Sequence, residues 1–206
     1  LLMVGGPDSF GAGGWRGTRI EAALPVKMDI QQRKKLPNGA LAVILHTCEF
    51  SQGNLWARRI AIASTEPLAP KDQFGVLVYT SGVDRWGIPL ADIGDKNAVL
   101  DQIKRLQPED MMTFGTSMQM AINGLLTANA YSKHVVVISD GDPTPPSKSL
   151  IDAYKQAGIS VSTICINPHN GPLGSATMKK IASDTGGRFY FVDDPTQLPQ
   201  IFFREA

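Results

Sequence analysis

The stretch at residues 135–144 constrains the fold of this chain more than any other, because a short run of apolar residues is followed directly by residues that form turns. It reads Val-Val-Val-Ile-Ser-Asp-Gly-Asp-Pro-Thr. Four β-branched residues in succession, too few for a helix and soon followed by turn residues, predict a strand that is buried on both faces. Such strands belong to parallel sheets. Because ligands of open α/β sheets bind beyond the carboxyl ends of the strands, Asp140 is expected at a functional site.

The chain from residue 39 onward alternates strands with helices. Strands are predicted at 41–45, 74–79, 135–138, 159–166 and 189–192, with a short edge strand at 86–90. Helices are predicted to start after Asn54, Asp95 and Ser147, and to span 117–130, 175–185 and the residues from 195. This alternation predicts a three-layer α/β/α fold with a doubly wound, mostly parallel, Rossmann-like sheet. The strand at 41 is expected beside the strand at 135, which brings the loop at 46–53 next to Asp140.

Composition fits one globular core and excludes some partners. Hydrophobic residues make up 43% of the 206 residues, and 20 Lys and Arg nearly balance 19 Asp and Glu. The net charge of +1 gives no reason to expect nucleic acid or a membrane surface as partner. Two cysteines, Cys48 and Cys165, are expected at the ends of strands separated by a third strand, beyond disulfide reach. Both are predicted to be free thiols.

Three segments are expected to converge at the carboxyl edge of the sheet: the loop after residue 45, a Gly-Thr turn ending at Thr116, and Asp140 with its following glycine. In this respect the chain resembles a von Willebrand factor type A (VWA) domain. That family has a first strand ending in Asp-x-Ser-x-Ser, a Gly-Thr turn opening a middle helix, and a strand ending in Asp-Gly. The resemblance implies a site where these oxygens hold Mg²⁺ or Mn²⁺ and a partner's carboxylate completes the shell.

The first of the three motifs departs from the family pattern. Where the family has Asp-x-Ser-x-Ser, this chain reads His-Thr-Cys-Glu-Phe from His46, so a carboxylate and two hydroxyls are replaced by imidazole, thiol and phenyl. Only Thr116 and Asp140 match the family's metal ligands, and they should bind Mg²⁺ or Mn²⁺ weakly or not at all. The set of candidate binding residues is His46, Cys48, Glu49, Thr116, Asp140 and Asp142.

Two further interpretations concern the same crevice. His46, Cys48, Glu49 and Asp140 together offer the N, S and O donors that Zn²⁺ accepts, but no closely spaced ligand pair of zinc type stands elsewhere in the chain. Four methionines cluster around Thr116, at 111, 112, 118 and 120. They suit either a core or an adaptable binding rim. The core is favoured, because methionines at the start of a buried helix usually pack inside.

The ends of the chain resemble parts of large bacterial envelope proteins. Residues 3–15 and 21–26 are similar to the tail of a class I glutamine amidotransferase-like domain, which in those proteins precedes a type A domain. The resemblance implies a remnant of that domain plus linker at 1–38 and the VWA domain at 39–206, in the cell envelope of a bacterium. The chain begins without Met and is expected to be a piece of a longer protein. It lacks the amidotransferase nucleophile, so that activity is not expected.

An enzyme of another class is the main alternative. The run from Asp140 to Thr144 satisfies the Asp-x-Asp-x-Thr pattern of haloacid dehalogenase-type phosphatases, with Asp140 as nucleophile and Asp142 as acid/base. Further residues follow in workable order: Thr163, Lys179 or Lys180, Asp193 and Asp194. That family, however, places its nucleophile on an early strand. The favoured function is a non-catalytic module that binds a protein partner or a neighbouring domain of the same longer chain.

Overall fold

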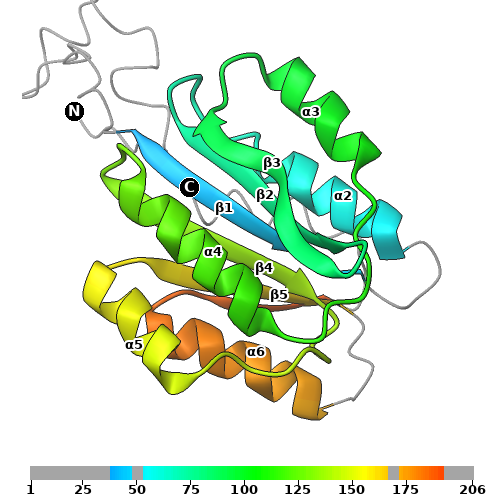
Figure 1. The fold of residues 1–206 in the computed structure, drawn as a ribbon, viewed down its shortest axis with the longest axis vertical. Helices are drawn as coiled ribbons and strands as arrows, with labels where there is room; N and C mark the ends of the chain where they lie inside the picture. The colour runs from blue at the N-terminus through cyan, green and yellow to red at the C-terminus, as the bar shows by residue number, and fades with distance from the viewer. Residues whose placement is uncertain (1–37, 48–52, 167–171, 193–206) are drawn as a thin grey trace, which may run out of the picture. The chain divides into compact units, whose positions relative to one another are not determined.

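A computed structural model of the chain describes residues 38–47, 53–166 and 172–192. The elements in these ranges are β1 (Gly39–Leu45), α2 (Gly53–Ala63), β2 (Gln73–Thr80), β3 (Val83–Asp92), α3 (Lys96–Arg105), α4 (Phe114–Thr127), β4 (Ser132–Ser139), α5 (Lys148–Ala157), β5 (Ser160–Ile166), α6 (Pro172–Thr185) and β6 (Phe189–Val192). Their order is the predicted one (Figure 1). The segment at 1–37 and the predicted helix from 195 lie outside the described residues.

The strands form one sheet in the order β3-β2-β1-β4-β5-β6. All neighbours are parallel except β3, which runs antiparallel to β2 at the edge. β1 therefore lies between β2 and β4, as the doubly wound order predicts. The edge strand is longer than expected, at ten residues, and contains Pro89, which is tolerated where no further strand needs its missing N–H.

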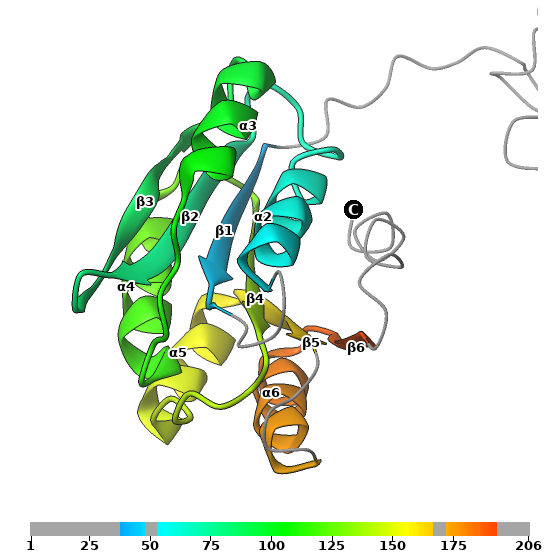
Figure 2. The ribbon, with the colours of Figure 1, turned by 90° about the vertical axis from the view of Figure 1, so that its right-hand side faces the viewer.

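The helices cover both faces of the sheet, α2 and α3 on one and α4, α5 and α6 on the other (Figures 1 and 2). Alternate residues of the central strands feed two separate cores: Val136 and Ile138 of β4 face the first group of helices, and Val135 and Val137 face the second. The prediction of a strand buried on both faces is thus confirmed. None of the described helices is long and apolar enough to cross a bilayer.

Capping contacts confirm two predicted helix starts, after Asp95 and Ser147, and mark the end of one helix. Asp95 accepts the N–H of Asn97 at the start of α3, and Ser147 accepts the N–H of Leu150 at the start of α5. Gly158 ends α5 with a φ of 65°, in the left-handed region where glycine carries no steric cost. These boundaries were predictable because each depends only on neighbours along the chain.

Two predicted helix starts are wrong. The helix predicted from residue 117 is α4, which begins at Phe114 because Thr113 caps it by accepting the N–H of Gly115. Asn54 does not cap α2, which already begins at Gly53. The side chain of Asn54 instead bonds to residues outside its helix, and those contacts belong to the candidate site.

Candidate functional site

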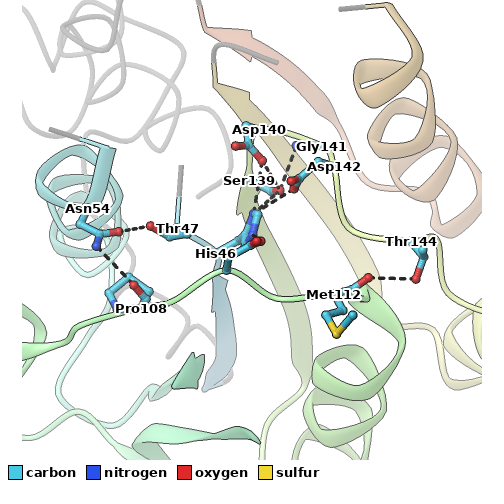
Figure 3. Close-up of polar contacts among 11 residues, drawn as sticks. His46, Thr47, Asn54, Pro108, Met112, Ser139, Asp140, Gly141, Asp142 and Thr144 are labelled. Atoms are coloured by element: carbon cyan, nitrogen blue, oxygen red, sulfur yellow. Dashed lines mark hydrogen bonds and ion pairs between the residues drawn. The ribbon is translucent and has the colours of Figure 1, made fainter. Parts of the chain in front are cut away.

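The neighbouring ends of β1 and β4 form the floor of the candidate site (Figure 3). His46 directly follows β1, and its backbone N–H donates to the carbonyl of Ile138 at 3.1 Å. Ser139 is the last residue of β4, and Asp140 follows it. Because β1 has β2 on one side and β4 on the other, this is the topological switch point of the sheet, where ligands of open α/β folds bind.

The imidazole of His46 lies at the centre of this cluster and is 0% exposed. Its Nε2 atom is 3.0 Å from Oδ1 of Asp110. Its Nδ1 atom is 2.9 Å from Oγ of Ser139, 3.3 Å from Oδ1 of Asp140 and 3.7 Å from Oδ1 of Asp142. Both ring nitrogens therefore face oxygen atoms, most of which belong to carboxylates. We call these five residues the His46 cluster.

The carboxylates control the charge of the ring. Burial by itself would lower the pKa of His46, because it disfavours the charged form. Hydrogen bonds to Asp140 and Asp110, together with the charges of Asp140 and Asp142, outweigh burial and raise the pKa of His46 above its ordinary 6.5. Burial, then the hydrogen bond and charge of Asp140, raise the pKa of Asp142 to about 6, although His46 opposes the shift. The cluster thus favours a protonated imidazole.

A glycine turn brings the second aspartate back to the ring. Gly141 has a φ of 91°, a conformation that L side chains rarely adopt, so the position favours glycine. Its N–H donates to Oγ of Ser139 at 2.9 Å, which closes the turn around Asp140. Asp140 is only 1% exposed, whereas the side chain of Asp142 is 25% exposed. The Asp-Gly-Asp sequence therefore supplies one buried carboxylate and one that is partly exposed.

Two loops are joined beside the His46 cluster. The N–H of Phe114 donates to the carbonyl of Thr144, and the N–H of Thr144 donates to the carbonyl of Met112, each at 3.0 Å. The hydroxyl of Thr144 adds a bond to the same Met112 carbonyl at 3.1 Å (Figure 3). Side chains at this junction reach solvent: Asp110 is 58% exposed and Met112 79%. We call Asp110, Met112, Asp142 and Thr144 the rim.

The loop that carries Asp110 is held from its other side by the start of α2. Thr47 donates its hydroxyl hydrogen to Oδ1 of Asn54 at 2.6 Å, and Nδ2 of Asn54 donates to the carbonyl of Pro108 at 3.3 Å (Figure 3). The backbone N–H of Glu109 donates to the carbonyl of Tyr79 at the end of β2. Asn54 is therefore a positioning residue for the approach of Asp110 to His46.

The sequence-predicted binding residues do not all lie in this cluster. His46, Asp140 and Asp142 meet there, whereas Cys48 and Glu49 lie outside the described residues. Thr116 is exposed on the first turn of α4. It lines a pocket of about 640 Å³ between α4 and α5, together with Thr113, Gly115, Gln119, Pro145, Pro146, Ser147, Ser149, Leu150 and Ala153. Its assignment as a metal ligand stays a prediction.

Sequence reasoning missed two members of the cluster, Asp110 and Ser139. Ser139 precedes Asp140 on the strand, so its own position next to the motif was the available signal. Asp110 has no comparable local signal, because its contact with His46 joins residues 64 positions apart. The core prediction is confirmed for three of the four methionines, since Met120 is partly buried against the second core. Met111 and Met118 are buried at 1% and 0%, whereas Met112 is exposed on the rim.

Cys165 is a free thiol, as predicted, and lies beneath the site. It is fully buried, and its Sγ atom is 3.9 Å from the carbonyl oxygen of Asp140. Burial, with a smaller effect from the charge of Asp140, raises the pKa of Cys165 to about 12. A thiol in this state is neither a nucleophile nor a ready metal ligand. The pairing state of Cys48 lies outside the described residues.

The His46 cluster suits a hard divalent cation poorly, although distances alone would admit one. One ligand atom each from His46, Asp110 and Asp142 lies within 4.8 Å of the other two. A ligating imidazole must be neutral and present a lone pair. Here carboxylates face both nitrogens and favour the doubly protonated ring. Mg²⁺ and Mn²⁺ prefer carboxylate, carbonyl and water oxygens, and an imidazole occupies the middle of this oxygen set.

The fold and the place of the site define a class: a Rossmann-like, doubly wound α/β domain with an acidic cluster at its switch point. The chain belongs to the von Willebrand factor type A domain family, whose model matches residues 58–204. The matched range begins after β1 and His46. The family assignment therefore depends on the rest of the sheet and its helices, and not on the loop where the motif departs.

Two proteins with similar sequences are much longer than this chain. Human von Willebrand factor A domain-containing protein 3B is 24% identical over 169 residues, which is 79% of this chain and 13% of that protein. Mouse matrilin-1 is 29% identical over 119 residues, which is 53% of this chain and 23% of that protein. The chain thus spans less than a quarter of the length of either relative.

Solved structures share the fold at low sequence identity. BatB from Bacteroides thetaiotaomicron has a TM-score of 0.60 at 16% identity, covering 82% of this chain and 96% of that one. The vWF domain of the type V pili tip protein Mfa5 from Porphyromonas gingivalis has a TM-score of 0.63 at 13% identity, covering 82% and 94%. Proximal thread matrix protein 1 from mussel byssus was solved with zinc in its metal-ion-dependent adhesion site (MIDAS) motif. It has a TM-score of 0.64 at 12% identity, covering 81% of this chain and 44% of that one.

Proposed function

We propose that the chain is a non-catalytic protein-interaction module that binds its partner through the rim. The observation that carries this proposal is the contrast between the two parts of the site. The two side chains that could take part in acid–base or nucleophilic chemistry, His46 and Asp140, are 0% and 1% exposed, and Nδ1 of His46 lies 3.3 Å from Oδ1 of Asp140. The rim beside them is exposed, and backbone hydrogen bonds join its two loops. A fixed, exposed surface beside a closed polar centre supports binding better than turnover.

The names of similar proteins support the same role. One similar domain belongs to a pili tip protein and another to a byssal thread matrix protein, both of which are parts of protein assemblies. An aerotolerance-related membrane protein from Bacteroides fragilis is also similar in fold. These names support a bacterial cell envelope as the location that we propose, and the sequence resemblance alone supports the proposal that residues 1–38 are the remnant of an amidotransferase-like domain. Its partner is then another envelope protein or a neighbouring domain of the same longer chain.

The buried state of Asp140 disfavours the phosphatase alternative. A nucleophilic carboxylate must reach the phosphorus atom, and at 1% exposure Asp140 faces His46 instead. Two of the residues that would complete such a site are engaged elsewhere, whereas Asp193 and Asp194 lie outside the described residues. Thr163 is buried and donates to the carbonyl of Met178, and Lys180 pairs with Asp184 on the surface of α6 at 2.8 Å.

Turnover of p-nitrophenyl phosphate with Mg²⁺ tests the enzyme alternative directly. We expect no activity above that of a heat-denatured sample. Activity that is retained on purification and lost in Asp140→Asn would overturn the proposal. Because that substitution also removes the charge partner of His46, the folded state of the variant is to be checked by circular dichroism.

Site-specific photo-crosslinking in the full protein, in its own cells, tests the binding surface. A photoreactive residue at Met112 samples the rim, and the matched control is Tyr131, which is 85% exposed and precedes β4 at the opposite edge of the sheet. We expect a discrete crosslinked product from position 112 and none from position 131. The reverse pattern, or the same products from both positions, would contradict a partner at the rim.

A further inference from the structure

His46 stands where the resemblance expects the first aspartate of the Asp-x-Ser-x-Ser motif. A carboxylate at this position would face three others, those of Asp110, Asp140 and Asp142. Four carboxylates held this closely repel one another and require a cation among them. The chain instead places the imidazole of His46 among the three carboxylates, and a protonated imidazole supplies the positive charge that they require.

Hydrogen-bond geometry indicates how many protons this ring carries. A neutral imidazole has one N–H and one bare nitrogen, whereas ionised carboxylates only accept hydrogen bonds. Asp110 meets Nε2 at 3.0 Å, and Asp140 meets Nδ1 at 3.3 Å. Oγ of Ser139 lies 2.9 Å from Nδ1 and accepts the N–H of Gly141; when its own hydrogen points to Asp140, 3.5 Å away, this oxygen also accepts from the ring. In this arrangement both ring nitrogens donate hydrogen bonds, so each carries a hydrogen.

We infer that the protonated ring of His46 is a cation built into the chain, which takes the place of a divalent ion in the centre of this type A domain. The ring is fully buried, so its charge acts on its neighbours with little screening by water. It is tied to the end of β1 by its own backbone, whose N–H donates to Ile138. Unlike a bound ion, this side chain cannot leave the site, and its charge is lost only by deprotonation.

Two properties follow for the domain. A divalent ion has no position at the centre unless the ring first loses a proton and moves aside. The charge left over, from three carboxylates and one imidazolium, is negative and is carried toward solvent by Asp110 and Asp142. Where the proposed binding function holds, contact with the partner is therefore insensitive to chelators, because no exchangeable ion takes part.

Exchanging His46 for aspartate tests this inference without any partner. In the 206-residue chain, His46→Asp removes the internal cation and restores the carboxylate of the motif, so four carboxylates then meet at the centre and the variant is expected to gain a requirement for metal. Its melting temperature should fall in chelator and rise by roughly 5–10 °C when Mg²⁺ or Mn²⁺ is present at about a hundredfold excess over its Kd. The wild-type chain should shift by less than about 1 °C under the same conditions, with Zn²⁺ as well.

Two further variants complete the design. His134→Asp adds a carboxylate near the start of β4, at the end of that strand away from the site, where His134 bonds to Ser160 at 2.7 Å, and should show no rise with metal. In case the crowded carboxylates prevent His46→Asp from folding, the double variant with Asp110→Asn removes one charge. It should fold in chelator and still gain stability from metal.

Two outcomes would overturn the inference. Stabilisation of the wild-type chain by Mg²⁺, Mn²⁺ or Zn²⁺ would make His46 a metal ligand rather than a cation. Absence of any metal response in both His46→Asp variants would show that the cluster does not surround an ion position. Neither outcome depends on the crosslinking experiment, so the inference and the proposed binding surface stand or fall separately.

Discussion

Replacing His46 with glutamine removes the positive charge of the cluster but keeps a side chain that donates hydrogen bonds. Asp140 is 1% exposed, so this variant holds a buried carboxylate without its cation. Removing one partner of a buried ion pair costs about 3–5 kcal/mol, because the remaining charge stays out of water. We therefore expect the free energy of unfolding of His46→Gln to fall by about 3–5 kcal/mol at about pH 6. In a domain of this size the melting temperature then falls by roughly 6–20 °C.

Urea unfolding followed by tryptophan fluorescence measures this loss. His134→Gln is the matched control, since His134 is only partly buried and its Nδ1 atom lies 2.7 Å from the hydroxyl of Ser160. The control should lose about 1 kcal/mol, the usual size of a single neutral hydrogen bond. A loss in His46→Gln no larger than that of His134→Gln would refute the reasoning, because it would mean that the buried carboxylate does not depend on an imidazolium.

The pH dependence of the same pair of proteins tests the charge itself. The pKa of His46 is raised in the folded chain above its ordinary 6.5. The stability that the proton contributes is therefore fully present below pH 6.5 and is lost as pH rises through the folded pKa. We expect the unfolding free energy of wild type to decline above pH 6.5 and that of His46→Gln to lack this decline. An equal decline in both proteins would assign it to other groups.

Three further predictions concern the acid, the rim and the thiol. The pKa of Asp142 is raised from 3.8 to about 6, so ionisation costs stability as pH rises through this window, and Asp142→Asn should stabilise the chain above pH 6, by about 1 kcal/mol once screening by water at this partly exposed side chain is allowed for. The gain, measured by urea unfolding, should vanish below pH 3.8, and a gain at both pH values would contradict it. Met112→Ser should change stability by less than about 0.5 kcal/mol, whereas Met118→Ser in the core should cost more than about 2 kcal/mol; similar losses would refute the core and rim assignments. In a Cys48→Ser background, Cys165 should react with iodoacetamide only after unfolding, as mass spectrometry would show, and rapid labelling of the native chain would contradict its burial.

The sheet was predictable because its signals are local. The run of β-branched residues in β4 needs both faces covered, whatever lies around it. Asp95 and Ser147 cap helices through atoms two or three residues away. The start of α4 was misplaced because Thr113 and Ser117 are both plausible caps in sequence, and only the bridge between Thr113 and Thr144 distinguishes them.

The centre of the site was less predictable because its chemistry depends on contacts between distant loops. The sequence indicated that the loop after β1 had lost its metal-binding oxygens, but not that His46 would replace an ion. That property arises only when Asp110, 64 residues further on, approaches the ring. The loop reaches this position through Asn54, whose side chain was predicted to cap a helix and instead bonds to Pro108. The domain boundary near residue 38 stays a prediction.

Because the positive charge of His46 is buried, it limits which groups of the site a partner is able to contact. In a metal-centred site of this family, a partner's carboxylate completes the shell of the ion, so chelators abolish the contact. Here His46 is 0% exposed, and the groups open to a partner are Asp110 and Met112. Such a contact combines packing on a thioether with an exposed charge, and added salt should weaken it where a chelator does not. Substitution of Met112 should then alter binding without altering stability, whereas substitution of His46 should alter both, because the buried ring contacts Asp110 and Asp142, one from each loop of the rim.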